Sequence, residues 1–356
     1  MTQRPTVLVL GASGTLGQRI VRLFRKHLPV VNLIGGGRQV GFHQAMTTRH
    51  IDLHDPASYG AALAGIDILI HAAGPFDHDP RPLVTACIQH RIHYIDIAES
   101  LPFIQCVKEA VMSLAQCPVA IVSGCSTVPG LAAALSQRFT HLEQATQIDV
   151  MLNMGSNNPL SHGLCFGLLR PLGQRLSQDA SPWFRCLSRE IHLDGRVRHY
   201  GNYPIPFEQT ITVGARALPV TFKVGFDRRA INIALYFSSF LLPQLSDSAV
   251  HALCRMAVRC GGLLALIGKS EGRFTLRALN SEGALLDTIE VIAAKNGLDI
   301  PAITTLWATA KLLDPTTTAS GFIGLEQLID HLTLEKKLDS LEDVSVVRRA
   351  NTLVLG

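Results

Sequence analysis

The first seventeen residues constrain the fold of this chain more than any other segment. Residues 6–10 form an apolar run rich in branched side chains, and the segment Gly11-Ala12-Ser13-Gly14-Thr15-Leu16-Gly17 follows at once. The apolar spacing after this segment predicts an amphipathic helix that ends before Pro29. A glycine-rich turn between a buried strand and a helix is typical of the start of a dinucleotide-binding fold.

The three glycines of this segment have separate steric roles in such a fold. Gly11 permits the tight turn out of the strand, Gly14 lets the backbone approach a pyrophosphate, and Gly17 lets the helix pack closely on the strand. The N–H groups at the start of the helix then bind the anion, and hydroxyl groups add donors. The cofactor-binding residues expected here are Gly11, Ser13, Gly14, Thr15, Leu16 and Gly17.

The residues after the second expected strand, 30–34, indicate which dinucleotide binds. An NAD site usually has Asp or Glu there to bind the ribose 2′-hydroxyl, but this chain reads Gly35-Gly36-Gly37-Arg38 and has no acid before Asp52. A guanidinium group suits a 2′-phosphate, so we expect NADP(H) rather than NAD(H). Arg38 as an ordinary surface residue remains the alternative, and Asp52 is a further cofactor-binding candidate.

Strands and helices continue to alternate up to residue 122. Further strands are expected at 66–73, 93–97 and 119–122, and helices begin near Asp55, Asp79 and Ser100. This order predicts an α/β fold with a doubly wound parallel Rossmann sheet. Because ligands bind at the carboxyl ends of such strands, we add Ala73, Gly74 and Pro75 to the cofactor-binding candidates.

The strand-end segments resemble the saccharopine dehydrogenase family in its broad sense. The residues that carry the resemblance are the glycine loop, His71-Ala72-Ala73-Gly74-Pro75-Phe76, His93-Tyr94-Ile95-Asp96-Ile97-Ala98, and Gly124 through Pro129-Gly130-Leu131. The resemblance covers about the first 140 residues and is fainter over residues 272–313. It implies a nicotinamide cofactor in the first domain, the Gly74-Pro75-Phe76 turn beside it, and a second domain whose sheet packs against its twin in a homodimer.

Three residues at the strand ends are the catalytic candidates. Asp96 could orient a substrate or take part in proton transfer, or it could equally cap the following helix. Tyr94 could contact the substrate or pack in the core. Cys125 could contact the substrate or belong to a structural turn. Many relatives have a short Gly-x-Asp-Pro-Gly turn after the sixth strand, and this chain has a longer loop without the acid, at residues 124–130. The substrate of amino-acid-forming relatives therefore does not carry over.

The regular alternation of strands and helices ends near residue 141. Strands are expected at 148–154, 197–203, 210–213 and 220–224, with a hairpin of 274–279 and 285–293 and a helix over 301–313. We therefore expect three parts: the Rossmann domain at 1–140, an α+β domain with a mostly antiparallel sheet for substrate and dimer contacts at 141–313, and a C-terminal helix and tail at 314–356 that pack back on the Rossmann domain.

Composition and spacing exclude several other functions. The formal net charge of +4 is too small for nucleic-acid binding, and no tyrosine is followed four residues later by lysine, as short-chain dehydrogenases require. The His50–His54 and His90–His93 pairs lack a third ligand, so no metal site is expected. None of the eight cysteines forms a CxxC motif, which favours free thiols and the cytoplasm.

These observations support an NADP(H)-dependent oxidoreductase that transfers hydride to or from a C=N, C=O or C=C bond of a small substrate. A cofactor-binding regulator or helper subunit without turnover is the alternative. The uncharged stretch 230–245 contains polar residues and is too short for a spanning helix. Contact with a membrane surface through residues 230–268 is a third possibility.

Overall fold

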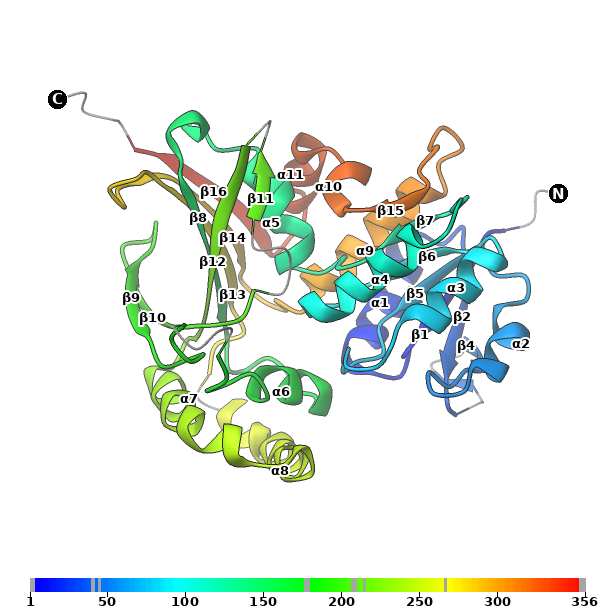
Figure 1. The fold of residues 1–356 in the computed structure, drawn as a ribbon, viewed down its shortest axis with the longest axis horizontal. Coiled ribbons are helices and arrows are strands. Elements are labelled where there is room, and N and C mark those ends of the chain that lie inside the picture. Colours follow the sequence, from blue (N-terminus) through cyan, green and yellow to red (C-terminus); the bar gives the residue numbers. More distant parts are fainter. Residues whose placement is uncertain are drawn as a thin grey trace. The chain divides into compact units, whose positions relative to one another are not determined.

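The computed structural model describes residues 4–39, 42–43, 46–175, 180–205, 210–213, 216–265 and 268–351, with the backbone alone at 42–43 and 260–265 (Figure 1). The chain forms two compact units. The first contains residues 1–131 and 298–330, and the second contains residues 132–297 and 331–356. Each unit is built around its own sheet.

The sheet of the first unit has the strand order β15-β7-β6-β5-β1-β2-β4-β3. All neighbours are parallel except β3 and β4, which pair antiparallel. This confirms the expected Rossmann-type sheet. Its strands are β1 (Thr6–Leu10), β2 (Asn32–Gly37), β3 (Phe42–His43), β4 (Met46–His50), β5 (Ile68–His71), β6 (His93–Asp96), β7 (Ala120–Val122) and β15 (Gly321–Ile323).

Helices between these strands bury their apolar faces against the sheet. α1 buries Ile20, Val21, Leu23 and Phe24, and all five residues of β1 are buried, as expected for strands covered on both faces. Asp55 caps the turn before α2, accepting a bond from Ala57 N. The helices of this unit are α1 (Thr15–His27), α2 (Tyr59–Leu63), α3 (Arg81–Gln89), α4 (Leu101–Met112), α9 (Asp299–Leu312) and α10 (Leu325–Leu328), and α5 (Val128–Ser136) spans the division at residue 131.

The second strand lies later in the chain than the expected range of 30–34. β2 includes the three glycines at 35–37, which looked like a loop in the sequence. A Cβ at Gly36 would lie 2.8 Å from Leu8 Cδ2, and one at Gly35 would lie 2.9 Å from Thr48 Cγ2. Side chains of β1 and β4 thus fill the space beside these glycines, so a larger residue would have to displace them.

Residues 298–313 were expected in the domain at 141–313, but they belong to the first unit, as do residues 314–330. Asp299 at the start of α9 forms ion pairs with Arg19 and Arg22 of α1, and β15 extends the parallel sheet beside β7. The chain therefore returns to the Rossmann sheet after it has built the second unit.

The second unit contains a mixed, mostly antiparallel sheet with the order β16-β14-β13-β8-β12-β10-β9, and β11 pairs with β12. Only β8 and β12 pair in parallel. The expected hairpin of β13 and β14 is confirmed. The strands are β8 (Gln147–Met154), β9 (Leu187–Ile191), β10 (Val197–Asn202), β11 (Thr210–Val213), β12 (Arg216–Phe226), β13 (Gly272–Leu279), β14 (Leu285–Ala293) and β16 (Val344–Ala350).

The C-terminal segment was expected to pack on the Rossmann domain, and the structure places its last elements elsewhere. β16 pairs antiparallel with β14 over its whole length, from Val344 opposite Ala293 to Ala350 opposite Asp287. The exposed edge of β14 thus gains its hydrogen-bond partners from the end of the chain. The helices of this unit are α6 (His162–Leu169), α7 (Arg229–Leu241), α8 (Asp247–Ala265) and α11 (His331–Asp339).

Candidate functional site

The glycine loop brings β1, β2 and the segment after β5 into contact. Gly11 N donates to Gly36 O at 2.9 Å, and Gly11 has a positive φ of 83°. A Cβ at Gly11 would lie 2.8 Å from both Cα and N of Ala73. Three separate parts of the expected cofactor site therefore meet at Gly11.

Gly14 and Gly17 shape the start of α1. A Cβ at Gly17 would lie 2.1 Å from the Gly11 carbonyl oxygen, whereas one at Gly14 would meet the same oxygen at 3.2 Å. Gly14 is the N-cap residue of α1, with no side-chain cap and no acid in the first turn. The N–H groups at the start of α1 therefore lack a protein anion, which is the arrangement that binds a phosphate group.

The polar side chains of the loop lie around this helix start. Ser13 is exposed and its carbonyl oxygen accepts a bond from Gln18 Nε2 at 2.8 Å. Thr15 and Leu16 are the first two residues of α1 and are half-buried. The hydroxyl groups of Ser13 and Thr15 are thus next to the expected pyrophosphate position.

The end of β2 has open space and an exposed guanidinium group beside it. A Cβ at Gly37 would meet nothing within 4 Å, so the space beside this residue is open. Arg38 follows directly and is exposed, and its carbonyl oxygen lies 3.1 Å from His50 Nδ1. Arg38 can therefore reach a ligand at the carboxyl end of β2.

Asp52 and the turn after β5 occupy different environments. Asp52 Oδ1 accepts a bond from His54 N at 3.0 Å, so this carboxylate stabilises the turn after β4. Gly74 and Pro75 follow Ala73 and are joined by a cis peptide bond, with Gly74 exposed and Pro75 half-buried. Gly74 follows directly on Ala73, which lies against Gly11, and Asp52 forms its hydrogen bond within its own turn.

Asp96 lies in the interior at the carboxyl end of β6 and is 0% exposed. Its Oδ1 accepts bonds from Gly124 N at 2.8 Å and Ala98 N at 3.0 Å, and its Oδ2 accepts one from Ser123 Oγ at 2.6 Å. Burial raises the pKa of Asp96, against the opposing effect of these hydrogen bonds. The carboxyl group ties the end of β6 to the loop after β7, which is a structural role other than the helix cap considered for it in the sequence.

Tyr94 and His71 extend this buried cluster. The Tyr94 hydroxyl lies 3.0 Å from His71 Nδ1 and also interacts with Asp96. Burial lowers the pKa of His71 to about 3 and raises that of Tyr94 well above its usual value. His71, Tyr94 and Asp96 thus form a buried chain of polar side chains, of which the sequence had indicated only the last two as candidates.

Cys125 also lies in the interior, and its carbonyl oxygen accepts a bond from Thr304 Oγ1 at 2.9 Å. Burial raises the pKa of its thiol to about 12, so the nucleophilic thiolate is disfavoured. The neighbouring Glu99 accepts bonds from Ser126 Oγ at 2.9 Å and Val128 N at 3.3 Å. Glu99 therefore caps α5 from outside the helix.

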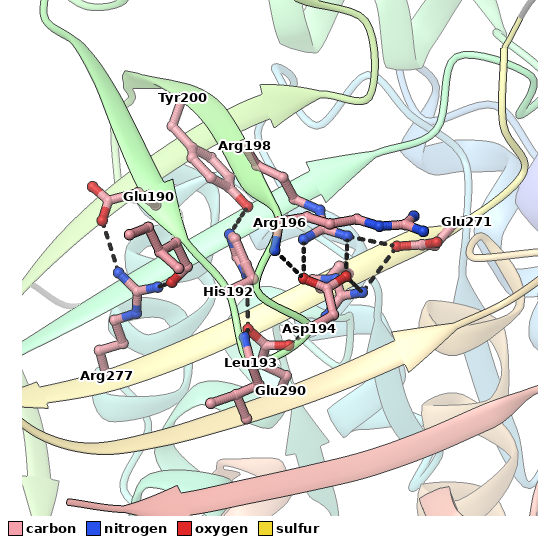
Figure 2. A network of polar contacts seen from close by, with 12 residues as sticks. Glu190, His192, Leu193, Asp194, Arg196, Arg198, Tyr200, Glu271, Arg277 and Glu290 are labelled. Atoms are coloured by element: carbon pink, nitrogen blue, oxygen red, sulfur yellow. Dashed lines mark hydrogen bonds and ion pairs between the residues drawn. The ribbon is translucent and has the colours of Figure 1, made fainter.

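A larger polar cluster, which the sequence analysis missed, lies in the second unit beneath the hairpin of β9 and β10 (Figure 2). His192 lies between Tyr200 and Glu290, with Nε2 2.8 Å from the Tyr200 hydroxyl and Nδ1 2.7 Å from Glu290 Oε1. Glu290 also pairs with Arg273, and both side chains are buried. Charged side chains of the hairpin and of β13 and β14 are thus joined in one network.

Arg277 and Lys223 continue this network on the same sheet. Arg277 donates to Glu190 Oε2 at 2.7 Å, and Lys223 Nζ lies 2.9 Å from Glu190 Oε1 and 3.3 Å from Asp149 Oδ2. A signal for this face is present in the sequence, because Arg273, Thr275 and Arg277 alternate with apolar residues along β13. The period of two places the three polar residues on one face.

Among the residues that the structure describes, no three His, Cys, Asp or Glu side chains are placed to hold a metal ion. Within the same residues, no helix combines the length and the apolar character needed to cross a membrane.

The fold and the glycine loop together define a dinucleotide-binding protein with a second, mixed-sheet unit. Residues 7–120 match the family described as "Saccharopine dehydrogenase NADP binding domain". This match confirms, over these residues, the resemblance seen in the sequence. No curated protein matches the chain.

A solved structure has the same fold over nearly the whole chain. Apo histidine-tagged saccharopine dehydrogenase (L-Glu forming) from Saccharomyces cerevisiae is similar over 98% of this chain and 100% of its own, with a TM-score of 0.63 and 11% identity. A Rossmann-fold NAD(P)-binding family protein from Shigella flexneri is similar over 34% of this chain and 67% of its own, with a TM-score of 0.27 and 13% identity. The first comparison shows that both units follow a known architecture.

Proposed function

We propose that this chain is an NADP(H)-dependent oxidoreductase that transfers hydride to or from a C=N, C=O or C=C bond of a small molecule. The observation that supports this most directly is the contact between Gly11, Gly36 and Ala73 beside the uncapped start of α1. The family match of residues 7–120 supports a nicotinamide dinucleotide as the ligand.

The residues present suggest how such a ligand is held. The N–H groups at the start of α1 bind the pyrophosphate and Gly14 keeps a Cβ atom out of its way, while Gly17 lets α1 pack against the Gly11 turn. Arg38 binds the 2′-phosphate with a charge-assisted bond. The nicotinamide ring, which donates or accepts the hydride, lies beside Gly74, and the protein contributes its position and electrostatic environment.

The same proposal includes a small-molecule substrate, a homodimer and a cytoplasmic location. The dimer is supported by the resemblance of the second unit to proteins whose sheets pack in pairs. The cysteines of the described residues are all free, which supports a reducing compartment. The substrate stays unassigned beyond the type of bond that is reduced or oxidised.

Binding of the two cofactors tests the proposal directly. We expect the fluorescence of NADPH to report binding at least tenfold tighter than that of NADH. In Arg38→Ala, NADPH affinity falls by about 10–100-fold while NADH affinity changes little, since a charged hydrogen bond contributes about 1.5–3 kcal/mol. Arg189→Ala, which removes an exposed charge in the second unit, serves as the control. Tighter binding of NADH, or an equal loss in both variants, would contradict the proposal.

A regulator that binds NADP(H) without turnover is the second candidate function. It is favoured by the burial of all three catalytic candidates, Tyr94, Asp96 and Cys125, each 0% exposed. Oxidation of NADPH in the presence of a panel of carbonyl compounds and imines separates the two candidates. Consumption of NADPH with any compound supports the enzyme, and tight binding with no turnover across the panel supports the regulator.

A further inference from the structure

The last residue of β4, His50, lies beside the last residue of β2. The two strands pair in parallel, with Gly35 opposite Thr48 and Gly37 opposite His50. Ile51 N donates to Gly37 O at 3.0 Å, so the pairing extends to the end of both strands. Because ligands bind at the carboxyl ends of such strands, His50 lies at the edge of the sheet where the 2′-phosphate of the proposed cofactor would be held.

The side chain of His50 belongs to the face of β4 that is next to the glycine loop. Side chains alternate along a strand, so Thr48 and His50 share one face and Arg49 has the other. A Cβ at Gly35 would lie 2.9 Å from Thr48 Cγ2 and 3.4 Å from Ala12 Cβ, which belongs to the glycine loop. His50 is therefore on the same side of the sheet as this loop.

His50 also holds the backbone of Arg38. Its Nδ1 lies 3.1 Å from the Arg38 carbonyl oxygen. A carbonyl oxygen can only accept a hydrogen bond, so Nδ1 carries the hydrogen and donates it. Arg38 directly follows β2, and the bond thus ties the chain to β4 at the point where it leaves the sheet.

The neighbouring Arg49 has a different task from Arg38. Its guanidinium group donates to Ala62 O at 2.8 Å and to Ala64 O at 2.6 Å, at the end of α2. Arg49 is thus engaged by the protein, whereas the Arg38 side chain is exposed. An exposed side chain has many conformations, and a ligand that orders it loses part of the binding free energy. A backbone held in place from β4 reduces this loss for Arg38.

We propose that His50 is a positioning residue that sets the preference for NADP(H) over NAD(H). Its Nδ1–H bond holds the Arg38 backbone so that the guanidinium group is directed at the 2′-phosphate. This inference rests on the proposed binding of NADP(H) at the glycine loop. NADH has a hydroxyl group in place of the 2′-phosphate, so its binding does not depend on how Arg38 is held.

Three substitutions of His50 in the full-length chain test the inference by fluorescence titration with NADPH and NADH. His50→Asn keeps an N–H donor near the position of Nδ1, His50→Gln places one nearer to Nε2, and His50→Ala removes both. We expect NADPH affinity to fall about 3–10-fold in His50→Ala and His50→Gln, and less than about twofold in His50→Asn. NADH affinity should change less than about twofold in all three variants, which also shows that the first unit stays folded.

Two results of this series would overturn the inference. Equal losses of NADPH and NADH affinity in His50→Ala would show that His50 supports the fold and not the choice of cofactor. Retention of NADPH affinity in His50→Gln but not in His50→Asn would show that the ring acts through Nε2 and not through the bond to Arg38.

A double-mutant cycle tests whether His50 acts through Arg38. In the Arg38→Ala background, His50→Ala should lower NADPH affinity no further, because the group that His50 positions is absent. A further loss as large as in the unmodified chain would overturn the inference. His90→Ala, at an exposed histidine that follows α3, is the matched control and should leave both affinities unchanged.

The unmodified chain separates this inference from the function on which it rests. If it prefers NADPH and His50→Ala keeps that preference, the inference fails and the proposed function stands. If it binds NADH as tightly as NADPH, both fail.

Discussion

The two units bury their ionisable groups in different ways. In the described part of the first unit, the fully buried ionisable groups of the sheet are His71 of β5 and Tyr94 and Asp96 of β6, and His71 and Asp96 lie at the carboxyl ends of these strands. In the second unit, Arg273, Arg277 and Glu290 lie within the strands of the sheet itself. The buried ionisable groups of the first sheet thus gather towards the carboxyl ends of β5 and β6, where a ligand is expected. The second sheet has a polar face covered by its own hairpin.

Because of this difference, we expect different substitutions to destabilise the two units. A network of buried ion pairs stabilises a fold little more than apolar packing would. The loss of one partner, however, leaves a buried charge without compensation. A glycine-lined turn instead tolerates polar changes nearby but no added atoms. We therefore expect charge removal to damage the second unit and added volume to damage the first.

The two tryptophans allow the units to be measured separately. Trp307 belongs to the first unit and Trp183 to the second. Variants that keep only one of them, with phenylalanine at the other position, report the unfolding of one unit each. The predictions below use the denaturant-induced change in fluorescence of these two reporters.

The largest effect is expected from Glu290→Gln. The carboxylate accepts bonds from His192, from Leu193 N at 3.2 Å and from Arg273, and an amide must turn its NH₂ group towards one of these donors. We expect the second unit to lose about 3–5 kcal/mol of unfolding free energy, reported by Trp183. The exposed Glu282→Gln serves as a control, with a change within about 0.5 kcal/mol. A loss of unfolding free energy below about 1 kcal/mol in Glu290→Gln would show that the second unit is not sensitive to charge removal in this network.

Adding volume to the loop of the first unit comes next. In Gly17→Ala the new Cβ would lie 2.1 Å from Gly11 O, whereas in Gly37→Ala it would meet nothing within 4 Å. We expect a loss of about 2–3 kcal/mol in the Trp307 signal for Gly17→Ala, together with a loss of NADPH binding. Gly37→Ala should change stability by less than about 1 kcal/mol. Equal effects of the two substitutions would remove the steric explanation of the loop.

The contrast also explains which parts of the structure the sequence could predict. Parallel strands buried on both faces are continuous apolar runs, so β1, β5 and β6 were visible, and the glycine loop marked the cofactor site. The glycines of β2 looked like a loop because the neighbouring Leu8 and Thr48 side chains that require them are distant in the chain. The same holds for β16 and β15, which are short edge strands stabilised by partners that local sequence does not reveal.

The buried network was less visible for a related reason. Its members come from β8, β9, β10, β12, β13 and β14 and from the turn between β9 and β10, and each strand contributes only one or two of them. The alternation along β13 could have indicated a polar face, but its burial depends on the hairpin that covers it. The contact of His71 with Tyr94 also depends on a partner strand. It is set by the pairing of β5 and β6, in which His71 lies opposite Asp96.

Acid should weaken the first unit through His71. Its pKa is about 3 in the folded protein and near 6.5 ordinarily, so the unfolded chain binds a proton that the folded chain excludes. The stability that this adds is complete above pH 6.5 and is lost as the pH falls towards 3. We expect a loss of about 2 kcal/mol in the Trp307 signal between pH 6.5 and pH 5.

The variant His71→Asn isolates this effect. An asparagine amide can replace the contact of Nδ1 with Tyr94 without titrating, so the loss with acid should become shallower in the Trp307 signal alone. The second unit should keep its own acid dependence, because burial also lowers the pKa of His192. An unchanged pH profile in His71→Asn would show that another group controls the acid response of the first unit.

The smallest change in stability is expected from Asp96→Asn, which also tests whether Asp96 takes part in chemistry. An amide oxygen can still accept bonds from Gly124 N and Ala98 N, and the Ser123 hydroxyl can turn to accept from the new NH₂ group. We therefore expect a loss of about 1 kcal/mol in the Trp307 signal and unchanged NADPH affinity. If Asp96 only joins two strand ends, NADPH turnover falls less than about threefold. If it moves a proton, turnover falls about 10²–10⁴-fold with binding intact. The second outcome would place a reacting group at a strand end of the first unit and would make its buried carboxyl differ from those of the second unit in function as well as in position.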